Sequence, residues 1–144
     1  ARLLIVAGGV DATLSARRNE TDISDSALPA VILLDGEEIA DDNDPEGRPA
    51  NAPRRVRMTP EVQFRLQAKA VDVGTNLNAY RAALIKAVLT DTTLVALTGN
   101  GGSFRYQGAM MAAERGRSME GGIGVAFTFT YLMRPDTLVE DVTA

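Results

Sequence analysis

Acidic side chains gather in one stretch of the chain, where their number and spacing suit cation binding. They are Asp35, Glu37, Glu38, Asp41, Asp42, Asp44 and Glu46. Asp42, Asp44, Glu46 and Gly47 align with the first half of an EF-hand calcium loop, but Pro53 then stands where the closing bidentate Glu belongs. We therefore expect no metal site and interpret the stretch as a solvated or partner-facing acidic loop, with a calcium-binding module as a minor alternative.

Arginines follow this acidic stretch directly, at Arg54, Arg55 and Arg57. They could contact phosphate or carboxylate groups; we favour pairing with the acidic loop, within one subunit or with a neighbour. Of the 15 basic residues 13 are Arg, the type enriched at protein interfaces, although a GC-rich coding genome explains the bias equally well. The sequence thus predicts subunit or partner contacts at Asp41, Asp42, Asp44, Arg54, Arg55 and Arg57, and at a second polar tip at Arg115 and Arg117.

Three residue types that carry much enzyme chemistry are missing, because the chain contains no Cys, His or Trp. Their absence excludes disulfides, Ser-His-Asp and Cys-His hydrolases, and imidazole or thiolate metal centres. The glycine-rich segments 99–102 and 121–124 match neither a P-loop nor a dinucleotide fingerprint. We expect no catalytic residue, no cofactor and no enzyme, with a small carboxylate hydrolase as a minor alternative.

The charge balance argues against a protein that grips nucleic acid. Lys and Arg number 15 against 19 Asp and Glu, for a net charge of −4, whereas phosphate binding normally needs a basic surplus. The apolar run Leu3–Ala7 is far too short to span a membrane, and no signal-peptide pattern is present. We expect a soluble, non-secreted protein without a membrane partner.

Alternating and continuous apolar runs predict the strands that must position these residues. Ala30–Leu34 is uniformly apolar, which is typical of a strand buried on both faces. From Val56 to about Val73 the alternation predicts a half-buried strand bent at Pro60. A short strand is expected at Phe104 and Tyr106, and a strand pair with a polar tip over 107–122. The strongest alternation, over 123–133, predicts a central strand beneath a helix.

Helical spacing is clearest over 76–90, with Thr75 or Asn76 as the N-cap, and a second short helix over 94–97 follows a cap at Asp91 or Thr92. Another short helix is expected within 2–14 and an extended piece at 17–20.

The 144 residues fit a single domain, 1–144. The predicted class is α+β: a mainly antiparallel sheet with one principal helix on one face, and a long flexible loop at about 36–54.

Several segments taken in order resemble one family. They are Arg18-Asn19, Leu28-Pro29-Ala30, Asp35-Gly36-Glu37, the strand around Val62, residues 76–87, Asp91-Thr92-Thr93-Leu94, Phe104–Gly108, Phe127–Tyr131 and Arg134-Pro135. Together they resemble the tail terminator (tail-completion) proteins of the head-to-tail neck of tailed bacteriophages and gene-transfer particles. Two features depart from that family: the N-terminal helix is short and broken by glycines, and the 36–54 loop is long.

The resemblance implies a structural virion protein, assembled in the host cytoplasm. Its ring, typically a hexamer, would cap the head-proximal end of the tail tube, stop tube polymerisation and contact the tail tube protein and the head-tail connector. DNA would pass through the channel without specific binding. Another neck or tail-tube component is the nearest alternative.

Overall fold

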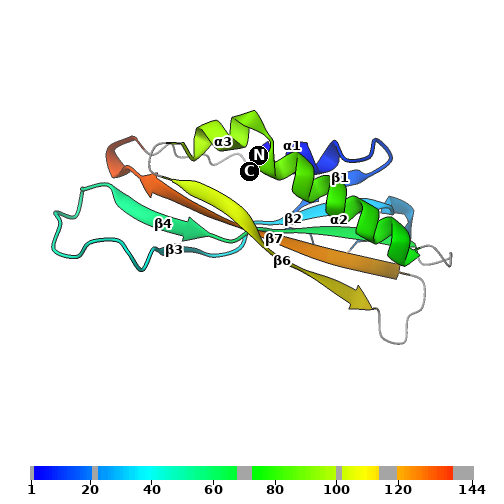
Figure 1. The fold of residues 1–144 in the computed structure, drawn as a ribbon. Coiled ribbons are helices and arrows are strands. Elements are labelled where there is room, and N and C mark those ends of the chain that lie inside the picture. Colours follow the sequence, from blue (N-terminus) through cyan, green and yellow to red (C-terminus); the bar gives the residue numbers. More distant parts are fainter. Residues whose placement is uncertain (1, 21–22, 68–72, 100–101, 114–119, 138–144) are drawn as a thin grey trace.

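The computed structural model describes residues 2–20, 23–67, 73–99, 102–113 and 120–137, and it shows three helices on one side of a seven-stranded sheet (Figure 1). The strand order is β1-β2-β5-β7-β4-β3, and β6 pairs with the other edge of β7. The elements are α1 (Arg2–Gly8), β1 (Ser15–Arg18), β2 (Ala30–Leu34), β3 (Glu38–Ala40), β4 (Arg54–Met58), β5 (Glu61–Gln67), α2 (Val73–Leu89), α3 (Thr92–Leu97), β6 (Ser103–Ala113) and β7 (Glu120–Met133). Short 3-10 helices cover Asp25–Ala27 and Pro135–Thr137.

The sheet is mainly antiparallel, as expected, since only β1 and β2 pair in parallel. The apolar run 30–34 forms β2 as predicted, and its first four residues are at most 4% exposed. Mixed α and β structure with a largely antiparallel sheet agrees with the α+β class.

Strand β7 is the central strand that the alternation predicted, because strands pair with both of its edges. Its bulky side chains Ile123, Val125 and Phe127 are buried in the core beneath α2. Strand β7 has 14 residues and is long enough to pair with two strands along one edge. There β5 pairs with its first half and β4 with its second.

The predicted bend at Pro60 separates β4 from β5 without changing their register. Met58 pairs with Phe129 and Glu61 with Ala126, so three residue steps on each strand separate the two pairs. The Pro60 carbonyl still accepts a hydrogen bond from the Phe127 N–H at 3.1 Å. Residues 54–67 therefore form one bent strand along β7, since proline lacks the N–H needed for unbroken pairing.

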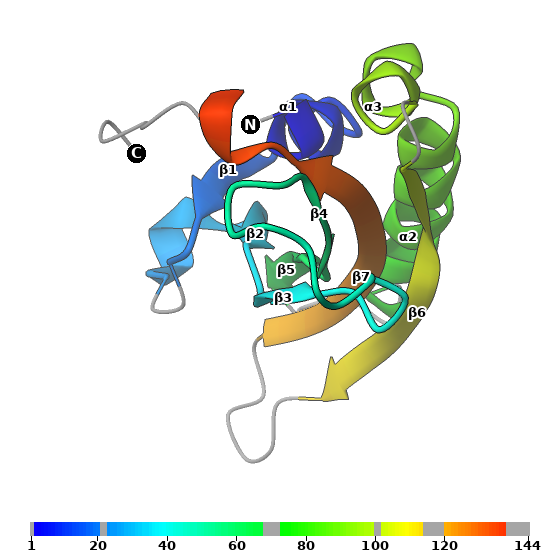
Figure 2. The same cartoon turned by 90° about the vertical axis from the view of Figure 1, so that its left-hand side faces the viewer.

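Strand β6, on the other edge of β7, is irregular at the same level of the sheet as Pro60. Gln107 is an extra residue there, because Tyr106 pairs with Phe127 and Gly108 with Ala126. This bulge replaces the expected division into a short strand at 104–106 and a separate pair over 107–122; β6 runs continuously through it to Ala113. Bulges bend strands and strengthen their twist, and β7 curves strongly in Figure 2, with α2 on its convex side.

The expectation of a flexible loop over 36–54 is wrong at both ends of that range. Glu38–Ala40 form strand β3, paired with β4, and Arg54 already belongs to β4. All three β3 residues are exposed, which explains why no hydrophobic pattern marked the strand. The second half of the acidic stretch, from Asp41 to Glu46, thus lies in the connection of a β-hairpin, residues 41–53.

The principal helix α2 packs on β5, β6 and β7, and it buries Leu77, Leu84 and Val88. It begins at Val73, so the predicted N-cap at Thr75 or Asn76 was wrong: both residues lie in the first turn. Tyr80 stacks on Phe64 with ring centroids 5.2 Å apart. No helix in the described part of the chain is long and apolar enough to cross a membrane.

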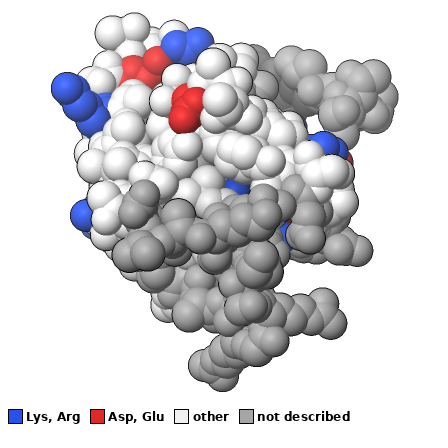
Figure 3. All heavy atoms as spheres, turned by 90° about the vertical axis from the view of Figure 1, so that its right-hand side faces the viewer, with Lys and Arg blue, Asp and Glu red and all other residues white. Residues whose placement is uncertain are grey.

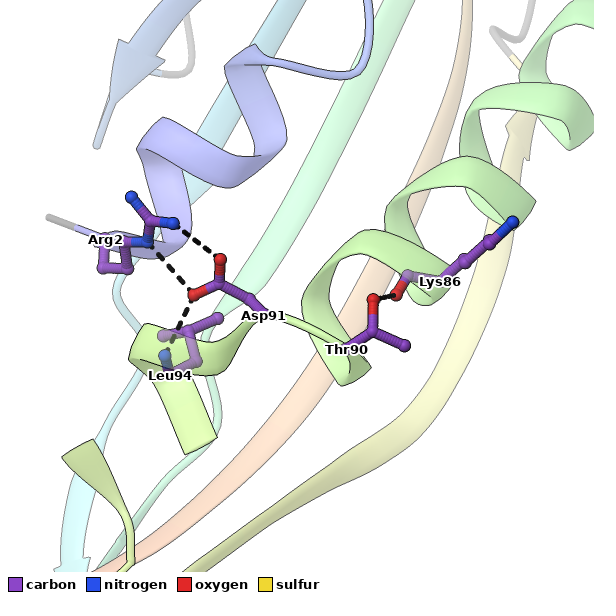
Figure 4. Close-up of polar contacts among 5 residues, drawn as sticks. All are labelled: Arg2, Lys86, Thr90, Asp91 and Leu94. Atoms are coloured by element: carbon purple, nitrogen blue, oxygen red, sulfur yellow. Dashed lines mark hydrogen bonds and ion pairs between the residues drawn. The ribbon is translucent and has the colours of Figure 1, made fainter. Parts of the chain in front are cut away.

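Asp91 joins two of the helices, as Figure 4 shows. Its carboxylate accepts the Leu94 N–H at 2.9 Å as the N-cap of α3, which confirms one of the two predicted caps. The Arg2 guanidinium at the start of α1 donates to both carboxylate oxygens, at 2.6 and 3.1 Å. These contacts lower the pKa of the Asp91 carboxyl, the bond from Arg2 most strongly.

Gly36 lies between β2 and β3 in close approach to Thr59, and its replacement tests this packing. It adopts φ +75°, and a Cβ there would lie 2.3 Å from the Thr59 carbonyl oxygen. Gly47 is a matched control, because it has φ +80° with nothing within 4 Å. We expect Gly47→Ala to cost about 1–2 kcal/mol of unfolding free energy from left-handed strain alone, and Gly36→Ala to cost clearly more. Urea unfolding measures both; equal losses would contradict the close approach of Gly36 to Thr59.

Candidate functional site

A concave pocket lies on the sheet face opposite α2, at the level where the strands are irregular. Its volume is about 410 Å³. It is lined by Glu37, Ile39, Arg57, Thr59, Arg105, Gln107 and Thr128; we call this set the arginine pocket. Residues on β3, β4, β7 and β6 all contribute, so the whole width of the sheet at this end builds the site.

A chain of hydrogen bonds forms one side of the arginine pocket. The Thr128 hydroxyl donates to the Gln107 Oε1 at 2.9 Å, and the hydroxyls of Thr59 and Thr128 lie 3.3 Å apart. A hydroxyl carries a single proton. Because Thr128 uses its proton toward Gln107, Thr59 must donate to Thr128. The Gln107 amide is thereby oriented by its oxygen, and its NH₂ group is left to donate.

The two arginines of the pocket come from opposite sides of β7. Arg57 pairs in register with Thr130, and Arg105 with Thr128. Their strands lie two spacings apart, about 10 Å, a gap that long side chains span. Neither guanidinium has a hydrogen bond or ion pair in the described part of the chain.

The acidic hairpin connection is held to β4 by one of its carboxylates. Asp44 accepts the Arg55 N–H at 2.9 Å and the Arg54 guanidinium at 3.4 Å. These contacts, the backbone bond first, lower the pKa of the Asp44 carboxyl. An internal pair between the acidic stretch and the arginines after it is therefore present, as the favoured interpretation expected, but it joins only Arg54 and Asp44.

Strand β3 has a second attachment, from Glu38 to Tyr131 of β7. The Tyr131 hydroxyl donates to the Glu38 carboxylate. Burial and this acceptor raise the pKa of Tyr131 far above its usual value. Because the phenol stays protonated, the bond persists at neutral pH and fixes the hairpin against β7.

The predicted contact residues occupy three different places. Asp41 and Asp42 lie in the hairpin connection, where Asp42 is exposed and Asp41 partly exposed. Asp44 and Arg54 are paired with each other, and Arg55 and Arg57 extend from the β4 face opposite the core. Arg115 and Arg117 lie outside the described residues.

Sequence reasoning missed the side of the pocket that β6 provides. Arg105 and Gln107 alternate with Phe104 and Tyr106, so this alternation was the available signal for a polar face. The stacked rings of Phe104 and Phe129, 5.2 Å apart, lie on the core side. What the pattern could not reveal was the register that brings Arg105 beside Thr128.

No family model matches the chain, and no curated protein matches it significantly. Within the described residues no three acidic side chains come together as a metal site. On the end of the molecule seen in Figure 3, the described charged side chains are few and scattered. The arginine pocket and the hairpin connection are therefore the charged features that we consider as contact surfaces.

The role of Asp44 can be tested against its neighbour Asp42. Asp44→Ala removes the acceptor for Arg54 and Arg55 and is expected to lower the melting temperature by a few degrees at pH 7. Asp42→Ala is the matched control, since Asp42 is exposed and its side chain has no hydrogen bond or ion pair in the described structure. In melts at a dilution where the chain is monomeric, it should leave the melting temperature unchanged.

The stability difference between the wild type and Asp44→Ala should depend on pH. The pKa of Asp44 is lower in the folded than in the unfolded chain. Its stabilisation is thus complete above the unfolded value, about 4, and is lost as the pH falls through the folded value. Circular dichroism melts from pH 7 to 2.5 should show the wild type and Asp44→Ala converging in acid. A gap that is independent of pH would contradict the ionic role.

Proposed function

We propose that this chain is a structural subunit that assembles with further copies of itself into a closed ring. The observation that carries the proposal is the outer edge of β6. That strand has 11 residues, and no described strand pairs with its outer edge. Natural proteins shield such edges with short strands, proline, charged residues or bulges. Strand β6 has one bulge and one charged residue, Arg105, but it is long and contains neither lysine nor proline.

Exposed apolar side chains on β6 support a partner at this edge. Met110 is 77% exposed and Tyr106 38%. The bulge at Gln107 matters here, because a one-residue shift exchanges the faces of all residues that follow; it pairs Met110 with Gly124 on the face away from α2. An edge strand with exposed apolar groups is well suited to pairing with a strand of another chain.

A closed ring needs two different complementary patches on each subunit. Besides β6, the edges of the sheet are β1 and β3, and β3 is short with all three residues exposed. These three edge strands differ in length and composition, which suits head-to-tail contacts between copies rather than a two-fold dimer.

The resemblance to tail terminators gives the ring its proposed place: the head-proximal end of a phage tail tube, as a hexamer. One face would contact the tail tube protein and the other the head-tail connector, so tube growth would end there. The net charge of −4 suits a channel that repels DNA phosphates. The arginine-rich sheet face would then lie at subunit boundaries and away from the channel.

A substitution at the β6 edge tests the ring. Met110→Lys adds a charge to an exposed side chain, so we expect little change in monomer stability and at least about tenfold weaker assembly. Ala82→Lys on the exposed surface of α2 is the control and should assemble as the wild type does. Light scattering over a concentration series gives the mass. A monomer at every concentration, or equal assembly by both variants, would count against the proposal.

A further inference from the structure

The arginine pocket presents two cationic groups that this chain does not neutralise. Arg57 is partly buried and Arg105 exposed, and neither has a hydrogen bond or ion pair in the described part of the molecule. Glu37 is the one acid that lines the pocket, and it lies beyond ion-pair distance of both arginines. The pocket therefore has positive charge left for a ligand.

The other polar groups that line the pocket favour a ligand that accepts hydrogen bonds. The Gln107 oxygen and both threonine hydroxyls are engaged with one another, so the Gln107 NH₂ is the free group of that chain. Together with two guanidinium forks this gives a site of hydrogen-bond donors, the arrangement that binds carboxylates through charge-assisted bonds.

The same chain carries unpartnered carboxylates at the end of its hairpin. Asp41, Asp42 and Glu46, which we call the acidic tip, form no hydrogen bond or ion pair through their side chains in the described structure. Within the connection 41–53 the one basic residue is Arg48, whose guanidinium donates to the Pro53 carbonyl at 3.2 Å. The connection forms the left-hand end of the molecule in Figure 1.

We propose that the acidic tip of one copy docks into the arginine pocket of a neighbouring copy. The inference rests on the proposed ring and names a second contact between its subunits, next to the β6 edge. Each copy has one tip and one pocket at different places, which is the asymmetry that a head-to-tail ring requires. The pocket includes Arg105 and Gln107 of β6, so a neighbour paired with the β6 edge lies next to it.

Charge reversal tests the contact from both sides. The pocket variant is Arg57→Glu with Arg105→Glu, and the tip variant is Asp42→Arg with Glu46→Arg. Each alone places like charges together and should raise the dissociation constant of assembly at least about tenfold. Combining all four substitutions in one chain restores opposite charges and should restore assembly. Mixing the two variants in equal amounts should also restore it, because tips and pockets then match in alternation.

Controls separate this contact from net charge and from folding. Arg81→Glu with Lys86→Glu makes the same change in charge on α2 and should not affect assembly. Arg57→Gln with Arg105→Gln is the milder pocket variant if the double glutamate unfolds, and it should weaken assembly in the same direction. Circular dichroism reports whether each variant is folded.

The outcomes distinguish this proposal from the ring itself. A wild-type chain that is monomeric at all concentrations overturns the ring and the docking together. A wild-type ring that tolerates the pocket variant, or a combined variant that is not restored, overturns the docking alone. A pocket variant that assembles normally but loses binding to a short DNA duplex assigns the pocket to phosphate and also overturns it.

Discussion

The structure depends on the pairing of β7 with strands on both of its edges. Its bulky side chains form the floor of the core under α2, and its opposite face contributes Thr128 to the arginine pocket. A register error of one residue in β7 would exchange these two faces. Core and candidate site therefore depend on the alignment of a single strand. The bend at Pro60 keeps the register of β4 and β5 with β7, whereas the bulge at Gln107 shifts the register of β6 by one residue.

Most of the core elements could be predicted because their patterns are local. The uniform apolar run of β2, the alternation of β7 and the N-cap at Asp91 each depend on a few adjacent residues. The missed features depend on partners distant in sequence. Strand β3 is exposed and exists through pairing with β4, and the Gln107 bulge is defined only by its register with β7.

In the candidate site, too, the features local in sequence could be predicted and those that depend on distant strands could not. The acidic stretch and the arginines after it were visible in sequence, and the pair between Asp44 and Arg54 joins residues only ten positions apart. Arg57 was predicted as a contact residue, but its companion Arg105 was not, because the two are brought to one pocket by β7. Composition suggested an assembly protein; topology identified which charges are neutralised internally and which remain free.

The central claim is that copies of this chain close into a ring through the β6 edge. Cryo-electron microscopy of the assembled chain tests it most directly. The account predicts a closed ring in which the outer edge of every β6 strand, Ser103–Ala113, contacts the next subunit. A ring or filament in which this edge faces solvent, or particles no larger than one chain, would contradict it.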